Sequence, residues 1–306
     1  MNGYLIVDKP EGMTSFDVIR RLRKCLQTKK IGHGGTLDPM VTGVLPVFVG
    51  NATRALSLLT ETDKEYVCRM KLGVKTDTED LTGTVLETSD AMPDEAKVLE
   101  AVLSFRGEYL QVPPMYSAKK VDGKKLVDLA RKGNVVSRKP ERRFIREIEV
   151  DRICLPYVWF RVVCSSGTYV RTLTADIGDK LGTFGAMASL RRTRHGAFSV
   201  RDAVSLPEIE AAAEGGGLSS LLHPTEELFR NYPKLSVAKD SERFLKNGNV
   251  LTVSDFPEAE TDRYFGLPEN ERTDRVRVAF SDGEFGGIYR FSDEEREFVP
   301  VRMFFA

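Results

Sequence analysis

The stretch IGHGGTLDPMVTGVLPV at residues 31–47 joins a glycine-rich loop to an apolar segment. Three of its first five residues are glycines, which allow a tight turn or a close approach to a ligand because glycine adopts positive φ at little cost. The loop presents one imidazole, His33, and one carboxylate, Asp38, before an apolar run that predicts a buried strand near 43–49. Loops on rigid strands often carry catalytic groups, although the composition is also that of an ordinary turn closed by Asp-Pro.

The spacing of apolar residues on either side of this stretch predicts both helices and strands. The expected helices lie over roughly 15–28, 52–60, 94–106 and 124–132. The expected strands lie over 3–7, 64–72, 142–155 and 157–164. The predicted apolar stripe of the first helix includes Phe16, and that of the third includes Leu99 and Leu103.

A further helix is predicted after Ser165-Ser166-Gly167-Thr168, with Thr168 as its N-cap. This start places Arg171 in the first turn, where a cation opposes the helix macrodipole. We therefore expect a carboxylate or a phosphate beside Arg171. The alternative is an exposed arginine that extends into solvent.

A chain of 306 residues is long enough for about two domains. The run Glu214-Gly215-Gly216-Gly217 within 211–220 indicates a linker. Several short strands predicted within 234–306 indicate a small β-barrel. We expect domains at 1–230 and 231–306.

Composition favours a soluble cytoplasmic protein. No apolar run approaches the roughly 20 residues that cross a bilayer, and the N-terminus lacks the pattern of a signal peptide. The four cysteines show no CxxC spacing, which argues against a zinc site or a disulfide framework.

The formal net charge is zero, but the charges are unevenly distributed: residues 113–146 hold eleven Lys/Arg against three acids, and residues 255–297 hold thirteen Asp/Glu against six Arg. The first segment is typical of a surface that binds a polyanion, with a solvated charged face as the alternative.

Several common catalytic patterns are missing from the sequence. It contains no GxxxxGK phosphate loop, no GxGxxG, no HExxH and no GxSxG, and its three histidines offer little for a metal site. The acidic run 77–83 does not complete a calcium loop, since Leu81 stands where an oxygen ligand is needed. An enzyme that acts on nucleic acid with Asp38, without a metal or a cofactor, fits what is left.

Seven stretches in order along the chain resemble the TruB-type tRNA pseudouridine synthases. The glycine-rich loop with Asp38 resembles the family signature. The other matching stretches are Lys9-Pro10 with Gly12 and Thr14-Ser15, Lys64-Glu65-Tyr66, Gly73 to Gly83, Val112-Pro113-Pro114 with Tyr116-Ser117-Ala118, Ser166 to Arg171, and Leu190-Arg191-Arg192. The resemblance implies an isomerase that converts uridine 55 in the T arm of tRNA to pseudouridine.

The resemblance also implies a fold and a set of site residues. The fold is α+β, with a mixed, mainly antiparallel sheet flanked by helices, a basic insertion at 113–146 that clasps RNA, and a C-terminal PUA-like barrel. Asp38 matches the catalytic aspartate, and Arg171 the arginine that pairs with it. Tyr66 matches the tyrosine that stacks on the target base and helps to remove the C5 proton, which implies a catalytic role for it as well. The other residues that match substrate-binding positions are His33, Tyr169, Leu190, Lys9, Lys119, Lys120, Arg191 and Arg192.

Two other functions fit the same stretches. One is a tRNA-binding or RNA-folding protein without catalysis, which the intact Asp38, Tyr66 and Arg171 argue against. The other is a guide-RNA-dependent pseudouridine synthase, which the basic insertion and the lack of long basic termini argue against. We expect a monomer that requires no protein partner, and the acidic charge of residues 255–297 is unusual for an RNA-binding barrel.

Overall fold

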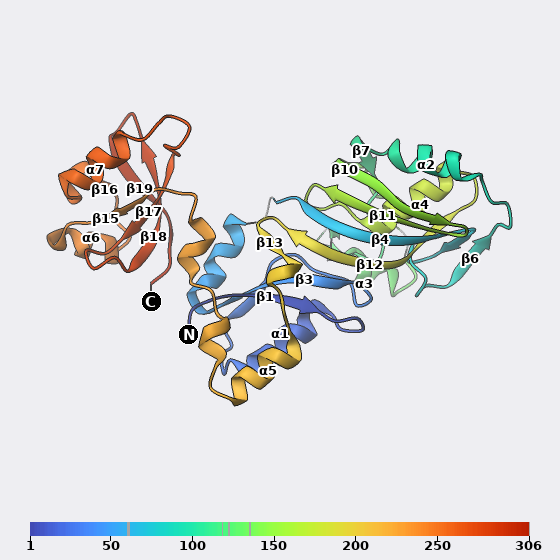
Figure 1. Cartoon of the computed structure of the whole chain (residues 1–306), viewed down its shortest axis with the longest axis horizontal. Helices are drawn as coiled ribbons and strands as arrows, with labels where there is room; N and C mark the ends of the chain where they lie inside the picture. Colours follow the sequence, from blue (N-terminus) through green and yellow to red (C-terminus); the bar gives the residue numbers. More distant parts are fainter. Residues whose placement is uncertain (60–61, 118, 122, 135, 306) are drawn as a thin grey trace.

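The computed structural model describes residues 1–59, 62–117, 119–121, 123–134 and 136–305. A ten-stranded sheet occupies most of the chain, and a five-stranded sheet forms a separate C-terminal lobe (Figure 1). The strands of the large sheet are β1 (Gly3–Lys9), β2 (Ile31–His33), β3 (Thr42–Val49), β4 (Lys64–Leu72), β7 (Gly107–Gln111), β10 (Glu141–Cys154), β11 (Tyr157–Cys164), β12 (Gly185–His195), β13 (Phe198–Ser199) and β14 (Val204–Ser205). Their order is β14-β1-β3-β12-β4-β11-β10-β7, with β2 paired to β3 and β13 to β12.

The sheet is mixed and mainly antiparallel, which confirms the expected fold class. Its parallel pairs are β1 with β14 and β12 with β3. The β12–β3 pair spans two residues on each strand and joins the two halves of the sheet. At this joint Gly43 has φ +101°, and a Cβ there would lie 2.1 Å from the carbonyl oxygen of Arg192, so the strands approach this closely because residue 43 is glycine.

Helices cover the sheet in two groups, one for each half. The helices in this part of the chain are α1 (Ser15–Cys25), the 3-10 helix η1 (Gly50–Leu58), α2 (Glu95–Leu103), α3 (Leu126–Ala130), α4 (Val170–Lys180) and α5 (Leu206–Glu214). The helices α2 and α4 pack on the half that contains β4, β11 and β10, whereas α1 and α5 lie together beside β1 (Figure 1). Two short hairpins complete this region: β5 (Val74–Thr76) with β6 (Val85–Thr88), and β8 (Lys120–Val121) with β9 (Lys124–Lys125).

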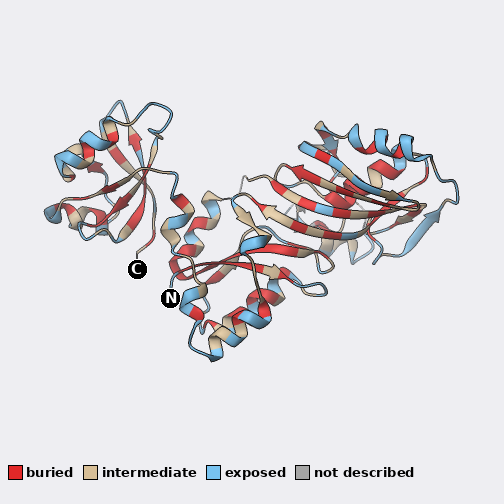
Figure 2. Ribbon diagram, in the orientation of Figure 1, coloured by how far each residue is buried: buried red, intermediate tan, exposed pale blue. Residues whose placement is uncertain are grey.

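Three apolar residues that were expected in helix stripes are exposed. Phe16 is 59% exposed because α1 turns Val18 and Leu22 toward the core, and Arg23 lies over the Phe16 ring. Leu99 and Leu103 are exposed because α2 buries Val98, Ala101 and Val102 instead. Figure 2 shows that much of the outward face of α2 is exposed. The roughly 3.6-residue spacing of apolar residues alone could not decide which side of the apolar stripe packs against the sheet.

The helix α4 begins one residue later than expected. Its N-cap is Tyr169, which makes no side-chain capping bond, and the Thr168 hydroxyl donates to the carbonyl of Ser165 at 2.9 Å. The amide of Gln111 holds the Tyr169 backbone instead, accepting from its N–H at 2.8 Å and donating to its carbonyl at 2.9 Å. The prediction that Thr168 caps the helix was therefore wrong, but Arg171 does lie in the first turn.

The C-terminal sheet curls around its own apolar core. Its strands are β15 (Lys234–Ser236), β16 (Leu251–Thr252), β17 (Arg275–Ala279), β18 (Phe285–Ser292) and β19 (Glu297–Met303), in the order β15-β17-β18-β19-β16. The helices α6 (Glu242–Lys246) and α7 (Glu258–Phe265) flank it. Short 3-10 turns complete the chain at η2 (Val200–Asp202), η3 (Leu218–Leu221), η4 (Thr225–Phe229), η5 (Lys239–Ser241) and η6 (Val253–Asp255).

The glycine run at 215–217 is not the linker that its composition suggested. It follows α5, and the chain then returns to the large sheet, where His223 exchanges backbone hydrogen bonds with Tyr4 at 2.9 and 3.0 Å.

The two lobes meet at η1, where Arg54 Nη1 donates to the carbonyls of Met303 and Phe305, each at 3.0 Å. Among the described residues, no helix combines the length and the apolar character that crossing a membrane requires.

Candidate active site

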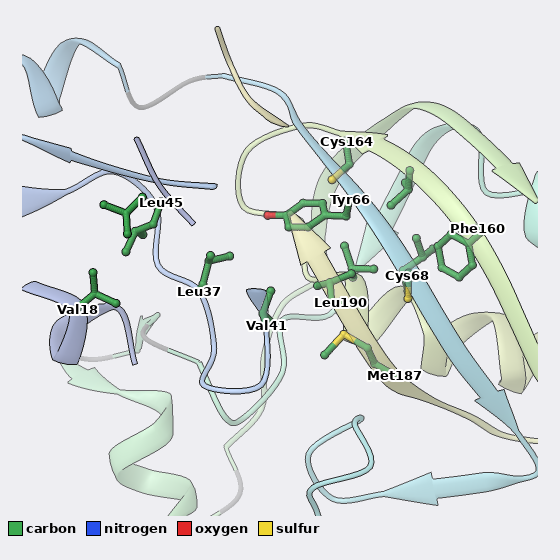
Figure 3. Close-up of a cluster of buried hydrophobic side chains, with 14 of the residues drawn as sticks. Val18, Leu37, Val41, Leu45, Tyr66, Cys68, Phe160, Cys164, Met187 and Leu190 are labelled. Carbon is green, nitrogen blue, oxygen red and sulfur yellow. The ribbon is translucent and has the colours of Figure 1, made fainter. Parts of the chain in front are cut away.

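A cavity of about 300 Å³ lies beside the joint between β3 and β12. Its walls come from the glycine-rich loop, β4, the start of α4, β12 and the beginning of the basic insertion. The lining residues are Gly35, Thr36, Leu37, Asp38, Val41, Lys64, Tyr66, Ser117, Ser166, Gly167, Thr168, Tyr169, Val170, Arg171, Met187, Leu190 and Arg192. Figure 3 shows Leu37 and Val41 opposite Met187 and Leu190 in the apolar part of this region.

The backbone on either side of Asp38 is fixed by hydrogen bonds. The Ser15 hydroxyl accepts from the N–H of Leu37 at 2.9 Å and donates to its carbonyl at 3.2 Å. The carbonyl of Asp38 accepts from the N–H of Val41 at 3.0 Å, which closes the turn. The side chain of Asp38 is 39% exposed, so its carboxylate can meet a ligand that enters the cavity.

Arg171 has the anionic partner that its helix position predicted. Its Nη1 lies 3.0 Å from Oδ2 of Asp38 and 4.0 Å from Oδ2 of Asp80. Its Nη2 donates to the backbone carbonyl of Tyr116. The side chain is 6% exposed, so these contacts fix the guanidinium in one orientation.

Asp80 is a site residue to which the sequence reasoning assigned no role. It lies in the turn at 77–83, whose sequence does not complete a calcium loop. Its Oδ1 accepts from the N–H of Thr82 at 2.9 Å and from the Thr78 hydroxyl at 2.8 Å, which leaves Oδ2 toward Arg171. A possible signal was the dense pattern of threonines around one aspartate, which is typical of a carboxylate held by its own turn.

Opposing influences act on the pKa of Asp38. Burial raises the pKa of this carboxyl group above its usual range, the Arg171 guanidinium lowers it, the Asp80 charge raises it, and the Lys9 ammonium lowers it. Burial is the largest influence, so the net shift is upward. The site therefore holds a carboxylate that is more basic than an exposed aspartate while Arg171 still orients it.

Tyr66 lies on β4 with its ring in the cavity wall and is almost fully buried (Figure 3). Burial raises the pKa of its hydroxyl, and the nearby Arg192 guanidinium acts in the opposite direction. The structure also places Leu190 and Tyr169 in the same wall, and Arg171 lies over the Tyr169 ring at 5.8 Å. Six of the predicted residues thus line one cavity: Asp38, Tyr66, Arg171, Tyr169, Leu190 and Arg192.

Lys9 lies at a different place from the one expected of a substrate contact. It is fully buried, and its Nζ donates to the carbonyls of Pro10, Met13 and Pro39. Burial lowers its pKa to about 8, against an opposing effect of Asp38. Lys9 therefore holds the residue that follows Asp38 and has no free surface for a phosphate.

Arg192 is fully buried as well, although it contributes to the lining of the cavity. Its Nε donates to the carbonyl of Val44 at 2.7 Å and its Nη2 to that of Gly35 at 3.0 Å. Gly35 has φ +72°, and a Cβ there would lie 3.2 Å from Nη1 of Arg192. Gly35 thus permits close packing of the loop on His195 and Arg192.

The other predicted RNA contacts lie nearer the surface. Arg191 forms a bidentate ion pair with Asp8, in which Nη2 lies 2.7 Å from Oδ2 and Nη1 lies 3.1 Å from Oδ1. The Arg191 side chain remains partly exposed. Lys119 forms an ion pair with Glu141. The side chain of Lys120 lies outside the described part of the structure, so its predicted role stays a prediction.

His33 lies beside a second cavity of about 360 Å³, which shares Gly35, Lys64 and Ser166 with the first. Nδ1 of His33 is buried and has no hydrogen-bond partner among the described residues. Burial and the nearby Arg192 lower the pKa of its imidazole, which favours the neutral form. In the described chain, no group of three or more His, Cys, Asp or Glu side chains could hold a metal ion.

Two family models match this chain in succession. Residues 23–170 match the TruB family pseudouridylate synthase N-terminal domain, and residues 171–230 match the tRNA pseudouridylate synthase B C-terminal domain. The boundary between the two matches falls at the start of α4, so the first contributes Asp38 and Tyr66 and the second contributes Arg171.

Curated relatives match over nearly the whole chain. The tRNA pseudouridine synthase B of Clostridium kluyveri is 42% identical over 304 residues, covering 99% of this chain and 100% of the relative. That of Lachnoclostridium phytofermentans is 43% identical over 312 residues, with 99% and 100% covered. Among solved structures, an H/ACA ribonucleoprotein bound to a substrate RNA containing 2′-deoxyuridine includes a chain that matches with a TM-score of 0.71 at 26% identity, covering 99% of this chain and 85% of that one.

Proposed function

Since the chain belongs to the TruB family of pseudouridylate synthases, we propose that it converts uridine 55 in the T arm of tRNA to pseudouridine. The observation that carries this proposal is the Asp38–Arg171 ion pair in the wall of a cavity large enough for a nucleobase. The relatives named tRNA pseudouridine synthase B support tRNA as the substrate.

The reaction is an isomerisation within one nucleotide. The N1–C1′ bond breaks, the uracil rotates, and a new bond joins C5 to C1′, while C5 loses a proton and N1 gains one. A carboxylate is the group that this sequence of steps needs, either at the sugar or at the base. Asp38 is partly exposed in the cavity and oriented by Arg171, so it can supply that carboxylate with little reorganisation.

Tyr66 would stack against the uracil ring. Burial raises the pKa of its hydroxyl, so Tyr66 is a neutral phenol at physiological pH, and this favours stacking over action as a free base. Leu190 and Tyr169 lie in the same wall and would bound the base on its other sides.

A uridine within the T loop must leave its stack to reach Asp38. Flipping costs a few kcal/mol, which contacts in the cavity have to offset. We propose that His33, beside the adjoining cavity, fills the space that the uridine vacates. A neutral imidazole can stack on neighbouring bases without desolvation of a charge.

The remaining expectations belong to the same proposal. We propose a catalytic domain at 1–230 with an RNA-clasping insertion at 113–146, and a PUA-like RNA-binding domain at 231–306, in a cytoplasmic monomer that needs no protein partner. The relatives at 42–43% identity favour a stand-alone tRNA pseudouridine synthase over a guide-RNA-dependent one, since the chain of the H/ACA ribonucleoprotein is only 26% identical.

The test uses an unmodified T-arm stem-loop labelled with tritium at C5 of its uridines. Pseudouridine formation releases the C5 hydrogen, so we expect tritium in water from the stem-loop and none when uridine 55 is replaced by cytidine. Equal release from the replaced RNA would reject uridine 55 as the target, and tight binding without release would favour the non-catalytic RNA-folding alternative.

A further inference from the structure

One carboxylate between two cations lies in the basic insertion. Oε1 of Glu141 pairs with Nζ of Lys119, and Oε2 of Glu141 pairs with Nη2 of Arg143. All three side chains keep some access to solvent, between 19% and 31% of their surface. Arg143 belongs to the insertion that was predicted to clasp RNA, but it was not among the individual RNA contacts predicted.

These three residues lie at the rim of the catalytic cavity. The Arg143 guanidinium packs against Gly167, where a Cβ would lie 3.1 Å from its Cζ, and Gly167 lines the cavity. Ser117, two residues before Lys119, lines the cavity from another side. The Ser165 hydroxyl accepts from the N–H of Phe144 at 2.9 Å, which fixes β10 against this loop.

The two cations, Lys119 and Arg143, are suited to binding a larger anion than a carboxylate. Two convergent cations on one carboxylate are the arrangement that also binds a phosphate, through charge-assisted hydrogen bonds. Nε of Arg143 is buried without a hydrogen-bond partner among the described residues, so Glu141 leaves part of the guanidinium unsatisfied. A phosphodiester next to a nucleotide in the cavity would have to pass over this rim.

We propose that Lys119 and Arg143 form a binding site for a backbone phosphate of the RNA, and that the Glu141 carboxylate occupies this site until RNA displaces it. This inference rests on the proposed function, because it takes RNA as the ligand. Glu141 then weakens binding by competing with the phosphate, and it also holds the two cations in place when no RNA is bound.

The test compares Glu141→Gln with Glu108→Gln in binding to the T-arm stem-loop at several salt concentrations. Glu108 is a matched control because it also pairs with an arginine of β10, Arg142, at 3.6 Å, and both side chains of that pair are largely exposed. We expect Glu141→Gln to lower the Kd about two- to fivefold and to steepen the slope of log K against log salt by up to about one. Glu108→Gln should change both quantities by less than half as much.

A double-mutant comparison locates the effect. Arg143→Gln should weaken binding, and in that background Glu141→Gln should lose most of its effect. Weaker binding by Glu141→Gln, or tightening no greater than that of Glu108→Gln, would overturn the proposal, provided that melting temperatures match the wild type. Tritium release by the wild type under the same conditions tests the proposed function separately.

Discussion

Nη1 of Arg171 lies 3.0 Å from Oδ2 of Asp38, and this contact joins the first turn of α4 to the loop that follows β2. The same nitrogen lies 4.0 Å from Asp80, so one buried guanidinium organises two carboxylates of unequal exposure. Asp80 is buried and held by its own turn, whereas Asp38 is open to the cavity. Asp80 is therefore positioned to hold Arg171, and Arg171 to hold Asp38.

Arg171→Lys should lower the single-turnover rate by about 100-fold or more, because a lysine keeps the charge but cannot reach Asp38, Asp80 and the Tyr116 carbonyl together. The Kd for the stem-loop should change little. Rapid-quench measurement of tritium release provides the rate, and an unchanged rate would show that the ion pair does not serve the chemical step.

Asp80→Asn should change how the rate depends on pH. The Asp80 charge raises the pKa of Asp38, so removing it should move the acidic limb of the pH–rate profile to lower pH. The rate at neutral pH should also fall about tenfold, because Arg171 loses its buried anchor. An acidic limb at the wild-type position would contradict the electrostatic coupling of the two carboxylates.

Lys9→Met separates support of the loop from contact with RNA. Its ammonium donates to three carbonyls, including that of Pro39 next to Asp38, and it is fully buried. We expect the variant to lose about 1–3 kcal/mol of stability and to react more slowly, while the salt dependence of RNA binding stays that of the wild type. A shallower salt slope would restore Lys9 as a phosphate contact.

The sequence predicted the site better than it predicted its surroundings. Arg171 was identifiable because a cation in the first turn of a helix needs an anion, and Tyr66 because alternation on one strand defines its buried face. The burial of Lys9 and Arg192 could not be predicted because it depends on carbonyls contributed by distant loops, which no local pattern encodes. The exposure of Phe16 and the late start of α4 were also set by tertiary contacts, through Val18, Leu22 and Gln111.

Asp38→Asn should raise the melting temperature at neutral pH. The pKa of Asp38 is raised in the folded state, so its stabilising contribution is complete below the unfolded-state pKa and is lost as pH rises through the folded-state pKa. An ionised Asp38 therefore costs stability at pH 7, and the uncharged amide should recover part of that cost. Thermal melts at acidic and neutral pH provide the check: the difference should vanish on acidification, and a variant less stable at pH 7 would contradict the direction of the shift.

The most direct test of Asp38 as the essential carboxylate is to map pseudouridine in unmodified tRNA after incubation with the wild type or with Asp38→Asn. We expect pseudouridine at position 55 with the wild type and none with the variant, whose Kd for tRNA should stay within about tenfold because only the chemical step is lost. Pseudouridine formed by Asp38→Asn at a rate near that of the wild type would contradict the account.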